Sequence, residues 1–111
     1  MFIKEEISDK EKDFKTLCKA HNVKYLYAFG SAITSKFDKD HSDIDLLVDI
    51  EITDPVERGE KLISLWNTFE IFFKRKVDLL TDSSIHNPYL RQSIDSTKVL
   101  IYDGTKQKVL V

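Results

Sequence analysis

The sequence predicts a small α+β or α/β domain in which helices cover a short β-sheet. Short runs rich in β-branched and aromatic residues alternate along the chain with apolar residues at helical spacing. The 111 residues include only three Gly and two Pro, and no linker or repeat divides them. Hydrophobic residues make up 41% and charged residues 32%, which is typical of a globular domain. We therefore expect residues 1–111 to form a single domain.

Three segments are predicted to be helical. The first follows Ser8, which forms a capping-box pattern with Glu11 ahead of apolar residues at helical spacing. The second begins after Asp54, an N-cap candidate followed by Pro55 at the first helical position. The third spans about residues 87–96. The core face of the second helix is expected to consist of Leu62, Trp66, Phe69 and Phe73.

Four segments are predicted to be strands, at residues 23–29, 43–50, 77–81 and 99–102. A loop with a short helical turn, residues 31–42, is expected to join the first two strands. The predicted order is therefore α-β-β-α-β-α-β.

Charge and composition exclude several classes of protein. Seventeen Lys and Arg oppose nineteen Asp and Glu, giving a net charge of -2, so there is no strong nucleic-acid signal. No apolar run reaches the length of a membrane span or a signal peptide, so we expect no membrane association. The single Cys18 can form neither an internal disulfide nor the centre of a zinc site. These features favour a cytoplasmic protein.

Asp43 and Asp45 are the strongest candidates for chemistry. Side chains alternate along a strand, so both point to the same face, with Cα atoms roughly 6.6 Å apart. Two carboxylates at this spacing suit Mg²⁺, which prefers carboxylates, water and substrate phosphates. The alternative is a pair of solvated carboxylates at a strand end, which carries less weight because Asp is depleted in strands.

Two further elements strengthen this interpretation. Gly30 and Ser31 directly follow a predicted strand, where a glycine allows close approach of a phosphate and a hydroxyl can bind it. Alone, this dipeptide is more typical of a plain helix cap. Asp78 lies inside another apolar strand, and if that strand neighbours the one carrying Asp43 and Asp45, three carboxylates converge.

Together these elements resemble the minimal nucleotidyltransferases of the DNA polymerase β superfamily, small proteins often paired with HEPN-domain partners as antitoxins. The resemblance covers residues 23–102 and rests on YAFGS at 27–31, SDIDLLV at 42–48 and KVDLL at 76–80. It implies a polymerase β-like nucleotidyltransferase fold, an α+β domain whose short mixed sheet is flanked by helices.

The resemblance also implies a role for each motif residue. Gly30 and Ser31 would hold the triphosphate of ATP or another NTP, and Asp43, Asp45 and Asp78 would bind two Mg²⁺ ions. Asp78 would in addition activate the acceptor hydroxyl. The implied reaction transfers a nucleoside monophosphate to a hydroxyl and releases pyrophosphate. A HEPN-type helical protein is the expected partner.

One departure concerns phosphate binding. Many members of this family carry Ala-Arg-Gly after the Gly-Ser pair, where this chain has Ala-Ile-Thr at 32–34. The role of the missing arginine is either vacant or taken by Lys36 or Lys39, although a solvated loop is the favoured interpretation of these two lysines. Arg91 is a candidate for contact with phosphate or a partner, but an exposed helix arginine is favoured there.

Three functions remain open at this stage. The first is Mg²⁺-dependent transfer, AMP from ATP being the first candidate, to a partner protein in a toxin–antitoxin pair. The second is transfer to a small-molecule, antibiotic-like hydroxyl, and the third is an antitoxin that acts by binding alone. The sequence does not select the nucleotide, and it allows homo- or hetero-oligomers.

Overall fold

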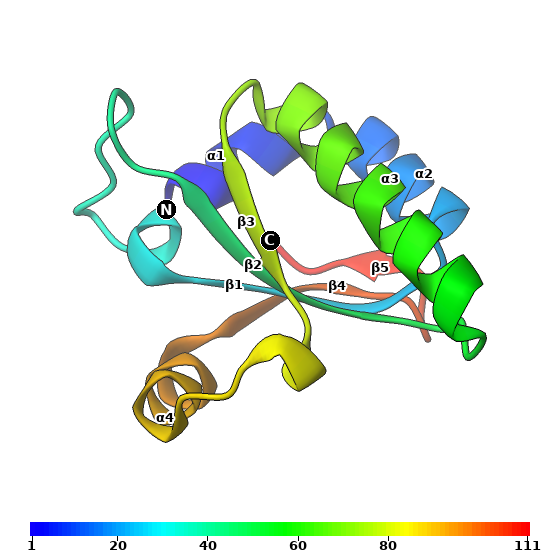
Figure 1. Cartoon of the computed structure of the whole chain (residues 1–111). Coiled ribbons are helices and arrows are strands. Elements are labelled where there is room, and N and C mark those ends of the chain that lie inside the picture. Colours follow the sequence, from blue (N-terminus) through cyan, green and yellow to red (C-terminus); the bar gives the residue numbers. More distant parts are fainter.

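The computed structural model describes residues 1–111 and consists of four α-helices and one five-stranded sheet (Figure 1). The helices are α1 (Phe2–Ser8), α2 (Glu11–Ala20), α3 (Pro55–Phe73) and α4 (Pro88–Thr97). The strands are β1 (Val23–Phe29), β2 (Ile44–Ile50), β3 (Val77–Leu80), β4 (Val99–Asp103) and β5 (Lys108–Val109). Two short 3₁₀ turns, η1 (Gly30–Ile33) and η2 (Asp82–Ser84), follow β1 and β3.

The sheet is mixed, which confirms the predicted α+β class. Its strand order is β3-β2-β1-β4-β5. β2 and β3 run parallel, whereas the β1–β2, β1–β4 and β4–β5 pairs are antiparallel. The long helix α3 makes the crossover between the two parallel strands. In Figure 1, α2 and α3 lie over one face of the sheet and α4 lies against the other.

The main core lies between the sheet and helices α1, α2 and α3, and twenty buried residues form it. β2 contributes four of them by strict alternation, Ile44, Leu46, Val48 and Ile50. A second, smaller cluster under α4 contains Phe29, Leu47, Ile85 and Ile94. The two clusters hold helices on both faces of the sheet, so the strand ends are fixed in position.

Several observed strand and helix boundaries agree with those predicted from the sequence. β1 has the predicted bounds, and β2 begins at Ile44, one residue after the predicted start. The Asp54 carboxylate accepts a hydrogen bond from the Glu57 amide at 2.9 Å, confirming the N-cap of α3. At the start of α4, the Asn87 side chain accepts from the amides of Tyr89 and Leu90.

The capping-box prediction at Ser8 is wrong. Ser8 is the last residue of α1, a helix that the sequence did not indicate, and its hydroxyl donates to the Lys4 carbonyl at 2.7 Å. α2 begins at Glu11 after Lys10, with no side-chain cap. The hydroxyl satisfies a carbonyl of its own helix instead of starting the next one.

Two other differences concern α3 and the end of the chain. Leu65, rather than Trp66, is buried beside Phe69 on the core face, while Trp66 is 39% exposed. The Trp66 indole nitrogen donates to the Val77 carbonyl at 2.6 Å, which ties α3 to the outer edge of β3. The chain also adds β5, which pairs with β4 after the turn at Gly104.

Candidate active site

One end of the sheet gathers three of the predicted site residues. β1 ends at Phe29, which pairs with Asp45 near the start of the antiparallel strand β2. On its other side, Asp45 pairs with Asp78 in the parallel strand β3. Adjacent strands lie about 4.8 Å apart. Gly30, Asp45 and Asp78 therefore sit side by side across three strands, although they are far apart in the sequence.

Two independent constraints require a glycine at position 30. Its φ angle is +73°, a left-handed conformation that side chains disfavour. A Cβ atom at this position would also collide with the carboxylate oxygen Oδ2 of Asp45. The glycine thus brings backbone directly against the central carboxylate and turns the chain from β1 into η1. The Thr34 amide and hydroxyl both donate to the Ser31 carbonyl at 3.0 Å, which closes this turn.

The electrostatics of the site centre on Asp45. Burial, the nearby charges of Asp78 and Asp43, and a hydrogen bond with Asp78 together raise the pKa of the Asp45 carboxyl to about 6, and burial is the largest of these causes. Neither Asp45 nor Asp78 forms an ion pair with a basic residue. The charges of Asp45 and Asp78 are therefore not balanced by an ion pair with a basic residue of the chain.

Asp43 lies at the rim of this group. It directly precedes β2, and its carboxylate is 4.0 Å from the Lys76 ammonium, the residue before β3. Both side chains are substantially exposed, so this contact contributes little to stability. It does place Asp43 on the side of the site nearest β3.

The donor set fits a divalent cation in its chemistry. As the side chains stand, no three His, Cys, Asp or Glu groups surround a single point closely enough to hold a metal ion. Three carboxylates nevertheless lie at one end of the sheet, and carboxylate oxygens are the ligands that Mg²⁺ prefers. A bound cation would offset the mutual repulsion that raises the Asp45 pKa.

A cleft of about 420 Å³ opens beside Gly30 and Asp45. Phe29, Ile33 and Thr34 form the wall next to η1. The opposite wall is one face of α4, at i, i+3, i+4 and i+7 spacing, and it consists of Leu90, Ser93, Ile94 and Thr97. Asp45 is the only charged residue that lines the cleft. No local sequence pattern indicates this wall, because the position of α4 depends on the packing of Ile94 in the second cluster.

The loop between η1 and β2 is held by Arg75, a contact that the sequence analysis also missed. The rings of Phe37 in the loop and Phe2 in α1 are stacked 4.1 Å apart, and the Arg75 guanidinium lies over both. Arg75 also donates to the carbonyl of Lys39 at 3.0 Å. These contacts fix the segment that leads into Asp43.

The proposed phosphate-binding side chains lie outside the cleft. Lys36 and Lys39 are exposed on the loop after η1. Arg91 faces η2 and donates to the Asp82 carbonyl at 2.7 Å, with a second contact of 3.4 Å to the Asp82 carboxylate. Arg91 therefore ties α4 to η2. Ser31 is half-buried in η1 and does not line the cleft.

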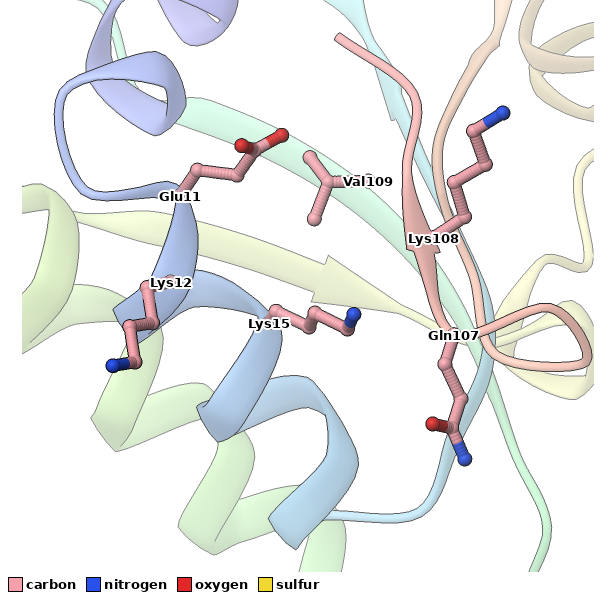
Figure 2. Close-up of a pocket in the computed structure, with 6 residues that line it drawn as sticks. All are labelled: Glu11, Lys12, Lys15, Gln107, Lys108 and Val109. Atoms are coloured by element: carbon pink, nitrogen blue, oxygen red, sulfur yellow. The ribbon is translucent and has the colours of Figure 1, made fainter.

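Another hollow of about 420 Å³ lies between α2 and β5, away from these acids (Figure 2). Glu11, Lys12, Lys15, Gln107, Lys108 and Val109 line it. Figure 2 shows that the Lys12 and Lys108 side chains extend in opposite directions, so the lysines do not converge on one point. None of the predicted site residues borders this hollow.

The site thus combines a glycine turn with paired carboxylates at one end of a mixed sheet. The sequence model of the family described as "Polymerase beta, Nucleotidyltransferase" matches residues 11–107. The chain belongs to this family and is a nucleotidyltransferase.

Known proteins support the assignment. The Methanocaldococcus jannaschii protein named "Putative protein adenylyltransferase MJ1217" is 40% identical over 86% of this chain and 92% of its own length. Among solved structures, "Structure of putative minimal nucleotidyltransferase" matches with a TM-score of 0.60 and 23% identity, over 86% of this chain and 92% of that one. A toxin–antitoxin structure with AMP-PNP matches with a TM-score of 0.60 and 21% identity, over 87% of this chain and 77% of that one. The two structural matches show the fold.

The helices of this chain give no indication of a transmembrane segment: none combines the required length with sufficient hydropathy.

Proposed function

We propose that this chain transfers a nucleoside monophosphate, AMP from ATP being the first candidate, to a hydroxyl group of a partner protein. The observation that carries the proposal is that Gly30, directly after β1, lies beside Asp45 of β2 and Asp78 of β3, next to an open cleft. It supports a phosphate chain bound beside Gly30 and an acceptor that approaches at Asp78.

Asp43, Asp45 and Asp78 are the proposed ligands for two Mg²⁺ ions. When bound, these ions neutralise phosphate charge and polarise the phosphorus–oxygen bonds. The chain offers only carboxylates at this point and no basic residue in the cleft, so a triphosphate needs cations from solution to bind here. Gly30 and Ser31 are the proposed contacts of the triphosphate, through the backbone and hydroxyl of η1.

Asp78 is the proposed general base. It takes the proton of the acceptor hydroxyl, whose oxygen then forms a bond to the α-phosphorus. The bond from that phosphorus to the oxygen bridging to the β-phosphate breaks, and pyrophosphate leaves with that oxygen. In an in-line displacement, the acceptor and the leaving group lie on opposite sides of the phosphorus. The acceptor therefore enters from the β3 side, and pyrophosphate leaves on the β1 side.

Two similarities support a protein as the acceptor. The M. jannaschii relative, 40% identical, carries protein adenylyltransferase in its name. A structural neighbour is a toxin–antitoxin assembly. We accordingly propose that the partner is a HEPN-type helical toxin that this chain neutralises by modification.

The test is label transfer from α-³²P-ATP with Mg²⁺ to a purified HEPN-type candidate partner and to proteins in a lysate of the source cells. Wild type is compared with Asp78→Asn and with the matched control Asp49→Asn, which removes a carboxylate from β2 outside the site. The expected result is a labelled protein band with wild type and Asp49→Asn that Asp78→Asn does not produce.

Two outcomes contradict this function. Label that persists in Asp78→Asn excludes the proposed base. No label with any of the four NTPs, combined with neutralisation that survives in the Asp43, Asp45, Asp78 triple Asn variant, favours an antitoxin that acts by binding alone.

A further inference from the structure

The cleft between η1 and α4 has two chemically different ends. Gly30 and Asp45 lie at one end, where the proposed function places phosphate groups and metal ions. The other end is lined by Leu90 and Ile94, with the hydroxyls of Ser93 and Thr97 beside them. No Lys or Arg lines the cleft, so its α4 end does not suit a phosphate.

The position of the cleft relative to Asp78 decides which substrate it can bind. Asp78 does not line the cleft, whereas Gly30 and Asp45 do. Under the proposed reaction, the acceptor approaches at Asp78 and the pyrophosphate leaves on the Gly30 side. The cleft therefore borders the bound NTP on the side away from the acceptor, and it is open to the nucleoside attached to the α-phosphate.

Two contacts hold the α4 wall in position. Ile94 is 1% exposed and packs in the cluster with Phe29, so it anchors the helix to the sheet. Arg91 fixes the start of α4 to η2 through the Asp82 carbonyl. Leu90, in contrast, is 44% exposed. It offers apolar surface that no part of the chain covers, next to a volume within the usual range for ligand pockets.

We infer that the α4 face of this cleft, centred on Leu90 and Ser93, is the subsite for the nucleoside portion of the NTP. Leu90 supplies the apolar surface on which the nucleoside packs. The hydroxyls of Ser93 and Thr97 are within the same wall and can exchange hydrogen bonds with the sugar or the edge of the base. This inference rests on the proposed function, because it takes the Gly30–Asp45 end as the phosphate end.

The experiment distinguishes the contribution of the nucleoside to binding from that of the phosphates by comparing the affinities of two ligands. Binding of ATP and of inorganic tripolyphosphate, each with Mg²⁺, is measured by calorimetry for wild type, Leu90→Ser and Ser93→Phe. The first variant removes the apolar surface, and the second fills the cleft with a bulky ring. Both positions are exposed on α4, so the fold tolerates either change.

Wild type is expected to bind ATP more tightly than tripolyphosphate. Leu90→Ser is expected to weaken ATP binding by about tenfold, the scale of a lost apolar contact in a pocket. Ser93→Phe is expected to weaken it by about tenfold or more because its ring occupies the space of the nucleoside. Tripolyphosphate binding is expected to be unchanged in both variants. Ile71→Ser, which removes a 77% exposed apolar side chain from α3, is the matched control and is expected to change neither affinity.

Each contrary result is informative. If wild type binds both ligands equally, or if the variants keep the affinity of wild type for ATP, the nucleoside does not use this wall. Equal weakening of both ligands assigns the α4 wall to the phosphates and overturns the inference. If ATP binding follows the expected pattern but no transfer is detected, the nucleoside subsite stands and the proposed transferase function fails.

Discussion

The two faces of β2 differ in chemistry although they belong to the same seven residues. The face toward α3 carries Ile44, Leu46, Val48 and Ile50, each at most 3% exposed. The opposite face begins with Asp45, whose pKa is raised to about 6 by burial and by the nearby charges of Asp78 and Asp43. The first face stabilises the sheet, whereas the second keeps like charges close together at the expense of stability. The apolar residues of β2 therefore stabilise the fold, whereas Asp45 on the opposite face is a candidate for chemistry.

The largest expected effect is on activity, at Asp45. Asp45→Asn retains the size of the side chain but removes the central carboxylate, so nucleotidyl transfer is expected to fall by about 10³-fold or more. The free energy of unfolding without metal is expected to stay equal or rise, because repulsion with Asp78 is lost. Steady-state label transfer and urea unfolding of the same samples measure both quantities.

Asp49→Asn is the control for this prediction, since Asp49 lies on the same strand at its far end, near Arg58. Activity retained by Asp45→Asn, or lost equally in Asp49→Asn, would show that Asp45 is not part of the reaction centre.

A substitution on the opposite, apolar face of β2 is expected to change the stability of the protein and not its ligand binding. Leu46 is fully buried in the main core, so Leu46→Ala is expected to lower the free energy of unfolding by about 3 kcal/mol. Below the unfolding transition, ATP binding by the variant is expected to match wild type, because Leu46 points away from the cleft. Urea unfolding gives the first quantity and calorimetry the second. A stable Leu46→Ala variant with impaired ATP binding would remove the distinction between the two faces.

The next effect concerns Gly30, where the two roles meet. Gly30→Ala forces a Cβ into the Asp45 carboxylate at a φ of +73°, so it is expected to destabilise the fold by about 1–2 kcal/mol and to displace Asp45. Gly59→Ala is the matched control, because a Cβ there meets no atom within 4 Å inside α3. That change is expected to stabilise the protein by about 0.5–1 kcal/mol through helix propensity. Thermal unfolding distinguishes the two signs.

The sequence predicted the features that depend on local interactions better than those that depend on contacts between distant segments. Alternation along residues 44–50 predicted the apolar face and the position of Asp45, because side-chain direction in a strand is local. The proximity of Asp78 was only conditional, since it depends on the α3 crossover placing β3 beside β2. Asp54 predicted the start of α3 correctly, because a cap is formed within one turn.

The missed features all depend on tertiary contacts or on very short elements. β5 has two residues, too few for a periodic pattern, and it exists through its pairing with β4. Arg75 lies in the basic run Lys-Arg-Lys at residues 74–76, directly after α3, yet its guanidinium contacts Phe2 and Phe37 in distant segments. The α4 wall of the cleft depends on where Ile94 packs, which no local pattern specifies.

The smallest expected effect is the pH dependence of stability that Asp45 confers in the absence of divalent ions. Because the pKa of Asp45 is raised in the folded state, the folded chain holds more of its proton than the unfolded chain between about pH 4 and about pH 6. Stability therefore falls as pH rises through this window. Partial solvent screening limits the change to about 1 kcal/mol.

Urea unfolding at pH 4.5 and pH 7 with EDTA measures this effect. Between these two pH values, the free energy of unfolding of Asp45→Asn is expected to rise by about 1 kcal/mol relative to that of wild type. Asp78→Asn removes the neighbouring charge but leaves Asp45 buried, so its free energy of unfolding is expected to rise by only part of this amount relative to wild type. Equal pH profiles for wild type and Asp45→Asn would mean that β2 carries its carboxylate without strain, and the contrast between its two faces would reduce to one of polarity alone.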